Sequence, residues 1–256
     1  MRLLTAIPVY NEERHLLGVL REVRRYSPEI LVIDDGSTDR TPELVTGLQD
    51  IHVIRHPKNR GYGAALISAF AYALKNCVQV LVTTDCDGQH EPARIPVLLE
   101  AIHDADIVSG SRYLRNFRED TTPPKDRLHI NQLITAELNE RFGLHLTDAF
   151  CGFKAYRTEA LARLQITETG WGMPLQLWVQ AARLGLRIKE VAVPRVYLDR
   201  KRAFGGVFND AEERLAYYRR VIAEAEQAPL PEEPAAKGQR ACASYSEWPA
   251  CEETCW

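Results

Sequence analysis

The chain has 256 residues, of which 45% are hydrophobic and 26% charged, and this composition is that of an ordinary globular protein. Its formal net charge of −3 gives no reason to expect nucleic acid as a partner, and no basic, aromatic-rich stretch supplies one. No apolar run approaches the roughly 18–20 residues that cross a bilayer, and the first residues turn polar too early for a signal peptide. We therefore expect a cytoplasmic protein with no transmembrane segment. Its six cysteines lack metal-type spacing and suit reduced thiols.

Short apolar strands alternate with helices through the first 113 residues. Strands are predicted at residues 3–9, 29–33, 51–54, 78–82 and 106–109. Helices follow the strands, and we expect Asn11 to cap the first of them and Asp39 or Thr41 to cap the second. This alternation predicts an α/β fold with a mostly parallel, Rossmann-like sheet and helices on both of its faces.

The pattern changes after Tyr113. Residues 115–125 show no periodicity and are predicted to form a mobile loop. Further helices are expected at about 126–142 and 174–184, with strands leading up to residue 156 and at 188–193, and Asn209 or Asp210 is expected to cap a last helix. Residues 228–256 are rich in Pro, Glu, Ala and Ser, which predicts a disordered tail.

Acidic and amide side chains follow the apolar strand at 78–82. Asp85, Asp87, Gln89 and His90 lie where a parallel strand opens into a loop, which is the edge where open α/β sheets bind ligands. In an extended segment Asp85 and Asp87 would point the same way, so both could face one divalent cation and the phosphates that it carries. The alternative is a turn rich in Asp and Gly that ends the strand and caps the next helix.

Other polar groups are expected at the same edge. Asp34 and Asp35 end the strand at 29–33, and an acid in this place either takes a ribose hydroxyl or a base edge, or caps a turn. The glycine-rich residues 59–65 lack the Lys-Ser/Thr of a P-loop, so their glycines serve packing or ligand contact. Basic residues on this rim either bind phosphates or are solvated surface groups; they are Arg112, Arg115, Arg118, Arg127 and residues 200–202.

Five motifs occur in one order: IPVYNE at 7–12, DDGSTD at 34–39, NRGYGA at 59–64, DCDGQH at 85–90 and GSRY at 110–113. Together they resemble family-2 glycosyltransferases of the GT-A fold, especially the branch of dolichyl-phosphate or polyprenyl-phosphate mannosyltransferases. Residues 148–153 and 190–200 continue the resemblance, which covers roughly residues 1–205. It implies one GT-A domain over residues 1–227, with a nucleotide-binding half at about 1–113 and an acceptor half at about 114–227.

The resemblance also implies an activity and a set of site residues. The activity is inverting transfer of a hexose from a nucleotide-diphosphate sugar of the GDP-mannose or UDP-glucose type, with Mg²⁺ or Mn²⁺ held by Asp87 and Gln89. The candidate substrate-binding residues are Pro8, Tyr10, Glu12, Asp34, Asp35, Asn59, Gly63, Asp85, Cys86, Arg112, Arg127 and Arg200. The candidate catalytic residues are Asp87, Asp148 and Arg202.

The acceptor implied by the resemblance is polyprenyl or dolichyl phosphate, which would bring the protein to the inner membrane face as a peripheral protein. A lipid phosphate is already anionic and needs no general base, whereas a hydroxyl acceptor needs a carboxylate, for which Asp148 is the candidate. Family members with a lipid acceptor often carry acids where residues 173–178 read MPLQLW, and a Ser-Lys pair where residues 203–206 read AFGG. A sugar or protein hydroxyl as acceptor, and a non-catalytic nucleotide-sugar-binding protein, therefore remain alternatives.

Overall fold

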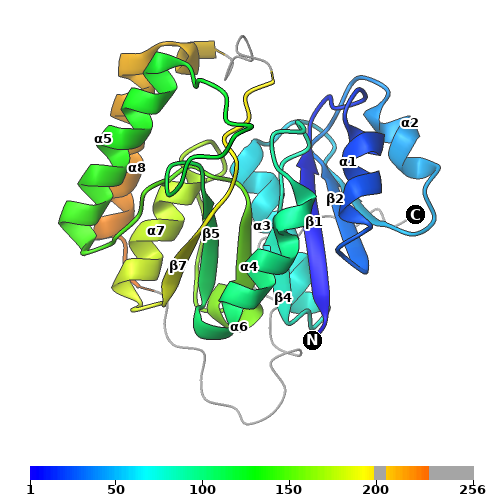
Figure 1. The fold of residues 1–256 in the computed structure, drawn as a ribbon, viewed down its shortest axis with the longest axis horizontal. Coiled ribbons are helices and arrows are strands. Elements are labelled where there is room, and N and C mark those ends of the chain that lie inside the picture. Colours follow the sequence, from blue (N-terminus) through cyan, green and yellow to red (C-terminus); the bar gives the residue numbers. More distant parts are fainter. Residues whose placement is uncertain (199–205, 231–256) are drawn as a thin grey trace.

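The computed structural model describes residues 1–198 and 206–230 (Figure 1). The predictions for Arg200, Arg202 and nearly all of the tail at 228–256 lie outside these residues. The described residues form one α/β domain built on a seven-stranded sheet with the strand order β3-β2-β1-β4-β6-β5-β7.

The strands are short and end at the polar motifs. They are β1 (Leu3–Val9), β2 (Glu29–Asp34), β3 (His52–Arg55), β4 (Val80–Thr83), β5 (Ile107–Ser111), β6 (Lys154–Arg157) and β7 (Ile188–Ala192). Neighbouring strands are parallel except at β6, which pairs antiparallel with both β4 and β5. The predicted mostly parallel sheet is therefore confirmed, with one inserted antiparallel strand.

Helices connect the strands. They are α1 (Leu16–Val23), α2 (Thr41–Thr46), α3 (Tyr62–Lys75), α4 (Ile95–Ala101), α5 (Lys125–Phe142), α6 (Thr158–Leu161), α7 (Met173–Arg183) and α8 (Ala211–Gln227), with 3-10 turns at Pro92–Arg94, Ile102–Asp104 and Gly206–Asn209. Figure 1 shows α5 and α8 side by side at one end of the sheet and the carboxyl end of β1 pointing up.

Both faces of the sheet are covered. Leu4 and Ala6 of β1 pack in one hydrophobic cluster with α3, α5, α7 and α8, whereas Ile7 and Val9 pack in a second cluster with α1 and α4. Alternate residues of one strand point to opposite faces, so a strand buried on both faces must be apolar almost throughout. This burial explains why β1 reads as a continuous apolar run, and it leaves the carboxyl edge of the sheet as the place for polar side chains.

The helix caps were predicted with mixed success. Asp210 accepts hydrogen bonds from the backbone N–H groups of Glu212 and Glu213 and caps α8, as expected. The prediction that Asn11 caps the first helix is wrong, because α1 begins only at Leu16. Asn11 has a φ of 57°, a left-handed conformation that Asn tolerates better than most residues, and its Oδ1 accepts a hydrogen bond from the N–H of Thr38 at 2.8 Å.

Asp39 supports the second helix from just outside it. The N-cap position of α2 is Arg40, so neither Asp39 nor Thr41 is the cap residue that was predicted. Asp39 nevertheless accepts a hydrogen bond from the N–H of Thr41 at 2.9 Å.

Three further expectations can be compared with the described residues. Residues 115–124 contain no helix or strand, but Asp120 ties them to the segment after β7 by accepting a 2.8 Å hydrogen bond from the N–H of Arg195. Cys86 and Cys151 are buried free thiols, as expected. Within residues 1–198 and 206–230, no helix is both long and apolar enough to cross a membrane.

Candidate functional site

Asp34 shapes the turn at the end of β2. Its Oδ1 accepts a hydrogen bond from the N–H of Ser37 at 2.8 Å, and its Oδ2 lies 3.2 Å from Nε of Arg55. The side chain is fully buried. Of the two roles that the sequence left open for Asp34, the structure shows the turn cap, and the carboxylate is buried away from solvent.

Asp35 holds the next loop of the edge. Its Oδ1 lies 2.6 Å from Nδ1 of His56 and accepts the N–H of Arg60 at 2.9 Å, and its Oδ2 accepts the N–H of Gly61 at 2.9 Å. Both oxygens of this buried carboxylate are thus engaged within the protein. The loop at 56–61 folds back over the acid, so Asp35 shapes this loop, and its contact with a ribose or base stays a prediction.

The glycines of the loop at 59–65 serve close packing. A Cβ on Gly63 would lie 2.3 Å from the carbonyl oxygen of Glu168, and a Cβ on Gly61 would lie 2.4 Å from that of Thr169. The N–H of Ala64 donates to the same Thr169 oxygen at 3.0 Å. Of the two interpretations left open by the sequence, the structure provides packing for Gly63, whereas Asn59 is exposed on the surface.

The end of β1 contributes residues of differing exposure. Pro8 is half-buried and Tyr10 is exposed, so the aromatic ring is open to a ligand. Glu12 is buried, and its backbone N–H donates to Oγ1 of Thr41 at 2.9 Å. These three residues line the start of the edge, next to the turn that Asp34 caps.

Asp85 lies between a phenol and an imidazole. The hydroxyl of Tyr62 donates to its Oδ1 at 3.1 Å, and Nε2 of His90 lies 3.7 Å from its Oδ2. Burial and the Asp85 carboxylate raise the pKa of Tyr62 well above its ordinary value, so the phenol keeps its proton. Burial alone would lower the pKa of His90, but Asp85, together with Cys151 and Asp87, raises it to about 9.

Asp87 and Gln89 pair with each other after a bend. The backbone N–H and the side-chain Nε2 of Gln89 donate to Asp87 at 3.0 and 2.7 Å. The chain bends at residues 86–88 instead of continuing as an extended strand, so the alternation of an extended segment does not apply to Asp85 and Asp87. Cys86 at the bend is buried in the hydrophobic core, so its side chain is not placed to contact a substrate as predicted.

The oxygen atoms of this pair suit a hard cation. The Asp87 carboxylate and the Gln89 amide oxygen are of the ligand type that Mg²⁺ and Mn²⁺ prefer, and both residues are half-buried at the strand end. The described residues contain no group of three or more His, Cys, Asp or Glu side chains that could hold a metal by themselves. The pair therefore fits an ion that takes its remaining ligands from water or from the phosphates of a substrate.

Arg112 and Asp148 form a buried, forked ion pair beyond β5. Nε and Nη2 of Arg112 donate to Oδ2 and Oδ1 of Asp148 at 2.6 and 2.9 Å. The carboxylate, whose side chain is 0% exposed, also accepts from the N–H of Arg112, from Nδ2 of Asn131 and from the N–H of Phe150. Glu190 fixes the preceding turn by accepting the N–H of Asp148 at 3.0 Å.

The environment of Asp148 does not favour a role as general base. Burial alone would raise its pKa, but the Arg112 guanidinium and the hydrogen bonds hold the pKa of this carboxyl below its ordinary value. A base must have an accessible lone pair and a pKa near the working pH. This geometry does not favour proton transfer to Asp148, and its role as the base for a hydroxyl acceptor stays a prediction.

Arg127, the remaining candidate arginine among the described residues, lies in the first turn of α5. It is half-buried next to Asp126, which pairs with Arg214 at 2.6 Å. Arg115 and Arg118 are exposed on the loop before the helix, and the Arg115 guanidinium lies 4.5 Å from the centroid of the Phe117 ring.

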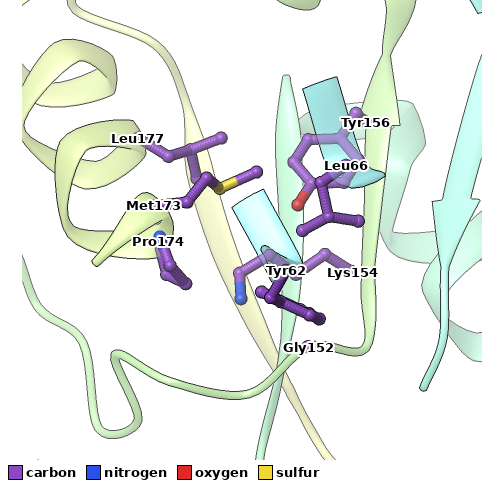
Figure 2. Close-up of a pocket in the computed structure, with 8 residues that line it drawn as sticks. All are labelled: Tyr62, Leu66, Gly152, Lys154, Tyr156, Met173, Pro174 and Leu177. Atoms are coloured by element: carbon purple, nitrogen blue, oxygen red, sulfur yellow. The ribbon is translucent and has the colours of Figure 1, made fainter. Parts of the chain in front are cut away.

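Several residues around Asp85 were not singled out by the sequence. Tyr62, Gly152 and Lys154 line a small pocket that α7 closes with Met173 and Pro174 (Figure 2). A Cβ on Gly152 would lie 2.5 Å from Oδ2 of Asp85 and 2.7 Å from the Tyr62 hydroxyl, so any larger residue would force these side chains to shift. Tyr62 and His90 stood within quoted motifs, but no spacing rule indicates that they converge on one acid.

Comparison with known proteins decides the family. Residues 5–165 match the family model of glycosyl transferase family 2. The chain is 35% identical over 222 residues to an undecaprenyl-phosphate mannosyltransferase of Micrococcus luteus, which covers 82% of this chain and 91% of that protein. The chain belongs to glycosyltransferase family 2. A polyprenol monophosphomannose synthase of Mycolicibacterium smegmatis is 33% identical over 210 residues, or 75% of this chain and 76% of that protein.

The fold of this family-2 glycosyltransferase agrees with solved structures. The glucosyl-3-phosphoglycerate synthase of Mycobacterium tuberculosis superposes with a TM-score of 0.66 at 22% identity, over 91% of this chain and 81% of that chain. At this identity the likeness concerns the fold alone. The predicted GT-A fold, family and enzyme class are thus confirmed, and the roles of individual residues stay predictions.

Proposed function

We propose that this glycosyltransferase moves a hexose from a nucleotide-diphosphate sugar to a polyprenyl phosphate, with inversion at the anomeric carbon. Mannose is the first candidate for this hexose. The two relatives reported above are named for mannose and for undecaprenyl phosphate or polyprenol, which supports this pair of substrates. The lipid acceptor implies that the protein works as a peripheral protein at a membrane surface.

The donor would lie over the carboxyl ends of β1, β2 and β4. The exposed ring of Tyr10, with Pro8 and Glu12, is available for the base and ribose. Asp85 is half-buried and offers a carboxylate edge to a ribose hydroxyl. Asp34 and Asp35 would support the donor site indirectly, because their hydrogen bonds hold the turns that form its walls.

Asp87 and Gln89 would hold the divalent cation. Their oxygens fit Mg²⁺ or Mn²⁺, and the ion would neutralise the nucleotide diphosphate as it leaves. The hydrogen bond between Gln89 Nε2 and Asp87 keeps the two side chains on one side of the loop, so that the Gln89 carbonyl oxygen can turn to the ion.

The burial and the hydrogen bonds of Asp148 are the observation that favours a phosphate acceptor. A hydroxyl acceptor needs a base, but this carboxylate is buried, accepts five hydrogen bonds and has a lowered pKa. A phosphate monoester is already anionic and attacks without losing a proton. Arg112 offers five N–H donors and spends three side-chain hydrogen bonds on Asp148 and Tyr197, so further donors remain for a phosphate.

The test compares two acceptors that differ in a single group. The purified protein is incubated with labelled GDP-mannose or UDP-glucose and with polyprenyl phosphate or polyprenol of the same chain length, in Mg²⁺, Mn²⁺ or chelator. We expect labelled lipid only with the phosphate and only with a divalent ion. Equal or greater transfer to the polyprenol would refute the phosphate acceptor. Failure of a folded protein to bind either donor in calorimetry would refute the proposed donor class.

A further inference from the structure

Lys154 is a buried cation between the donor and acceptor ends of the sheet. It is the first residue of β6, and its register partners are Thr83 of β4 and Ser109 of β5. Asp85 follows Thr83 by two residues, and Arg112 follows Ser109 by three. Lys154 is 2% exposed, so its ammonium is placed inside the protein, where an uncompensated charge is costly.

The contacts of the ammonium are few. Its Nζ donates a hydrogen bond to the carbonyl oxygen of Cys151, and it lies 5.2 Å from the centroid of the Trp178 ring. In the part of the chain that the structure describes, Lys154 forms no ion pair with a carboxylate. A buried lysine whose direct partners carry no negative charge calls for an electrostatic explanation at longer range.

That explanation lies in the two site carboxylates. Burial lowers the pKa of Lys154, whereas Cys151, Asp148 and Asp85 act to raise it and Arg112 acts to lower it. Among the groups that face the ammonium, the two carboxylates are those of the proposed donor and acceptor ends. The ammonium of Lys154 thus lies in the field of both acids without pairing with either, whereas Arg112 pairs directly with Asp148.

The hydrogen bond from the Lys154 ammonium to Cys151 joins the lysine to a turn next to Asp85. Cys151 precedes Gly152, whose backbone lies so close to Asp85 that a Cβ would stand 2.5 Å from its Oδ2. Oγ1 of Thr83 donates to the carbonyl oxygen of Gly152 at 2.8 Å and fastens the same turn from β4. A shift of Cys151 would therefore move the surface against which Asp85 rests.

We propose that Lys154 is a positioning residue, whose buried positive charge holds the turn at 151–152 against Asp85 and adds to that of Arg112 in offsetting the charges of Asp85 and Asp148. This inference rests on the proposed function, since it assumes that Asp85 serves the donor and that Arg112 with Asp148 serves the acceptor. The proposed role of Lys154 involves no contact with either substrate.

The charge of Lys154 predicts that activity depends on pH. A lysine in this place loses its proton at a lower pH than an exposed lysine, because burial lowers its pKa. The neutral amine can neither balance the carboxylates nor donate as strongly to the Cys151 carbonyl. Activity should then fall on the alkaline side, and an arginine, which stays charged, should move this fall to higher pH.

The test uses three variants of the full chain with the proposed donor and polyprenyl phosphate. Lys154→Met keeps the length of the side chain without its charge, Lys154→Arg keeps the charge, and Lys189→Met removes an exposed lysine of β7 as a matched control. Melting temperature, kcat, both KM values and the pH profile of kcat are measured for each. We expect kcat of Lys154→Met to fall by about two orders of magnitude, as for a small misplacement of reacting groups. Lys154→Arg should recover a large part of this loss and shift the alkaline limb upward.

Each outcome decides the proposal. A Lys154→Met enzyme with kcat within twofold of wild type would overturn it, as would a folded Lys154→Arg enzyme as inactive as Lys154→Met. If Lys154→Met does not fold, the pH profiles of wild type and Lys154→Arg decide, and identical alkaline limbs would overturn the proposal. Absence of transfer by the wild type would instead refute the proposed function. In that case the same pH comparison is made on nucleotide-sugar binding, where unchanged profiles overturn the role of Lys154.

Discussion

Replacing Asp148 with asparagine should destabilise the protein strongly. The change leaves the Arg112 guanidinium, which is 17% exposed, without its counter-charge. Removing one partner of a buried ion pair costs about 3–5 kcal/mol, and asparagine retains the shape and some of the hydrogen bonds, so we expect the lower end, about 3 kcal/mol. In a chain of this size 1 kcal/mol corresponds to about 2–4 °C in melting temperature, which gives a fall of about 6–12 °C.

The assay is thermal and urea unfolding at pH 7, with Asp106→Asn as the matched control. Asp106 makes the same fork with Arg187, at 3.1 and 2.9 Å, but the Arg187 side chain is 61% exposed, so the loss should be much smaller. Similar shifts for the two variants would refute the argument that burial makes the Arg112–Asp148 pair important.

The pH dependence of stability checks the same reasoning. The pKa of folded Asp148 lies below its ordinary value of 3.8, so its stabilisation is present above that pH and is lost as pH falls through the lowered pKa. The difference in unfolding free energy between wild type and Asp148→Asn should therefore narrow below about pH 4. A difference that stays constant into that range would show that the charge of Asp148 is not what stabilises the fold.

Three further predictions concern the donor end and a helix cap. Gly152→Ala should force Asp85 to move and lower kcat/KM by about 10²-fold, and unchanged steady-state kinetics would contradict the close approach. Asp87→Ala should abolish the Mn²⁺-dependent part of nucleotide-sugar binding in calorimetry, and unaltered affinity in Mn²⁺ would remove Asp87 from the metal role. Asp210→Ala removes both N–H contacts at the start of α8 and should lower the unfolding free energy by about 1 kcal/mol in urea titrations, whereas an unshifted midpoint would speak against this cap.

The sheet and its functional edge could be predicted from the sequence because they depend on local patterns. β1 was predicted with its observed bounds, since an apolar run buried on both faces ends at a polar motif. The same reasoning located the ends of β2 and β4, where Asp34, Asp85 and Asp87 stand. Parallel strands bring their carboxyl ends to one edge, so the neighbourhood of these acids followed from the fold class.

Whether each carboxylate is paired within the protein could not be predicted, because its partners lie far along the chain. Asp35 is occupied by His56 and by backbone N–H groups 25 and 26 residues later, and Asp148 by Arg112, 36 residues earlier. Sequence shows where a carboxylate stands, but whether it faces a ligand or caps a distant loop is decided by tertiary contacts. For Asp148 this difference changed the chemistry, from a candidate base to one half of a buried ion pair.

The position of β6 explains why the two ends of the site belong together. A wholly parallel sheet would place β4 and β5 as neighbours, but β6 enters between them in the antiparallel direction. An antiparallel strand begins at the edge where its parallel neighbours end, so the segment at 148–153 must run along the carboxyl edge before β6 starts. That segment carries Asp148 at one end and Gly152, which rests against Asp85, at the other. The proposed donor and acceptor ends therefore share one wall, and on that proposal a change that shifts this segment should affect binding of both substrates rather than of one alone.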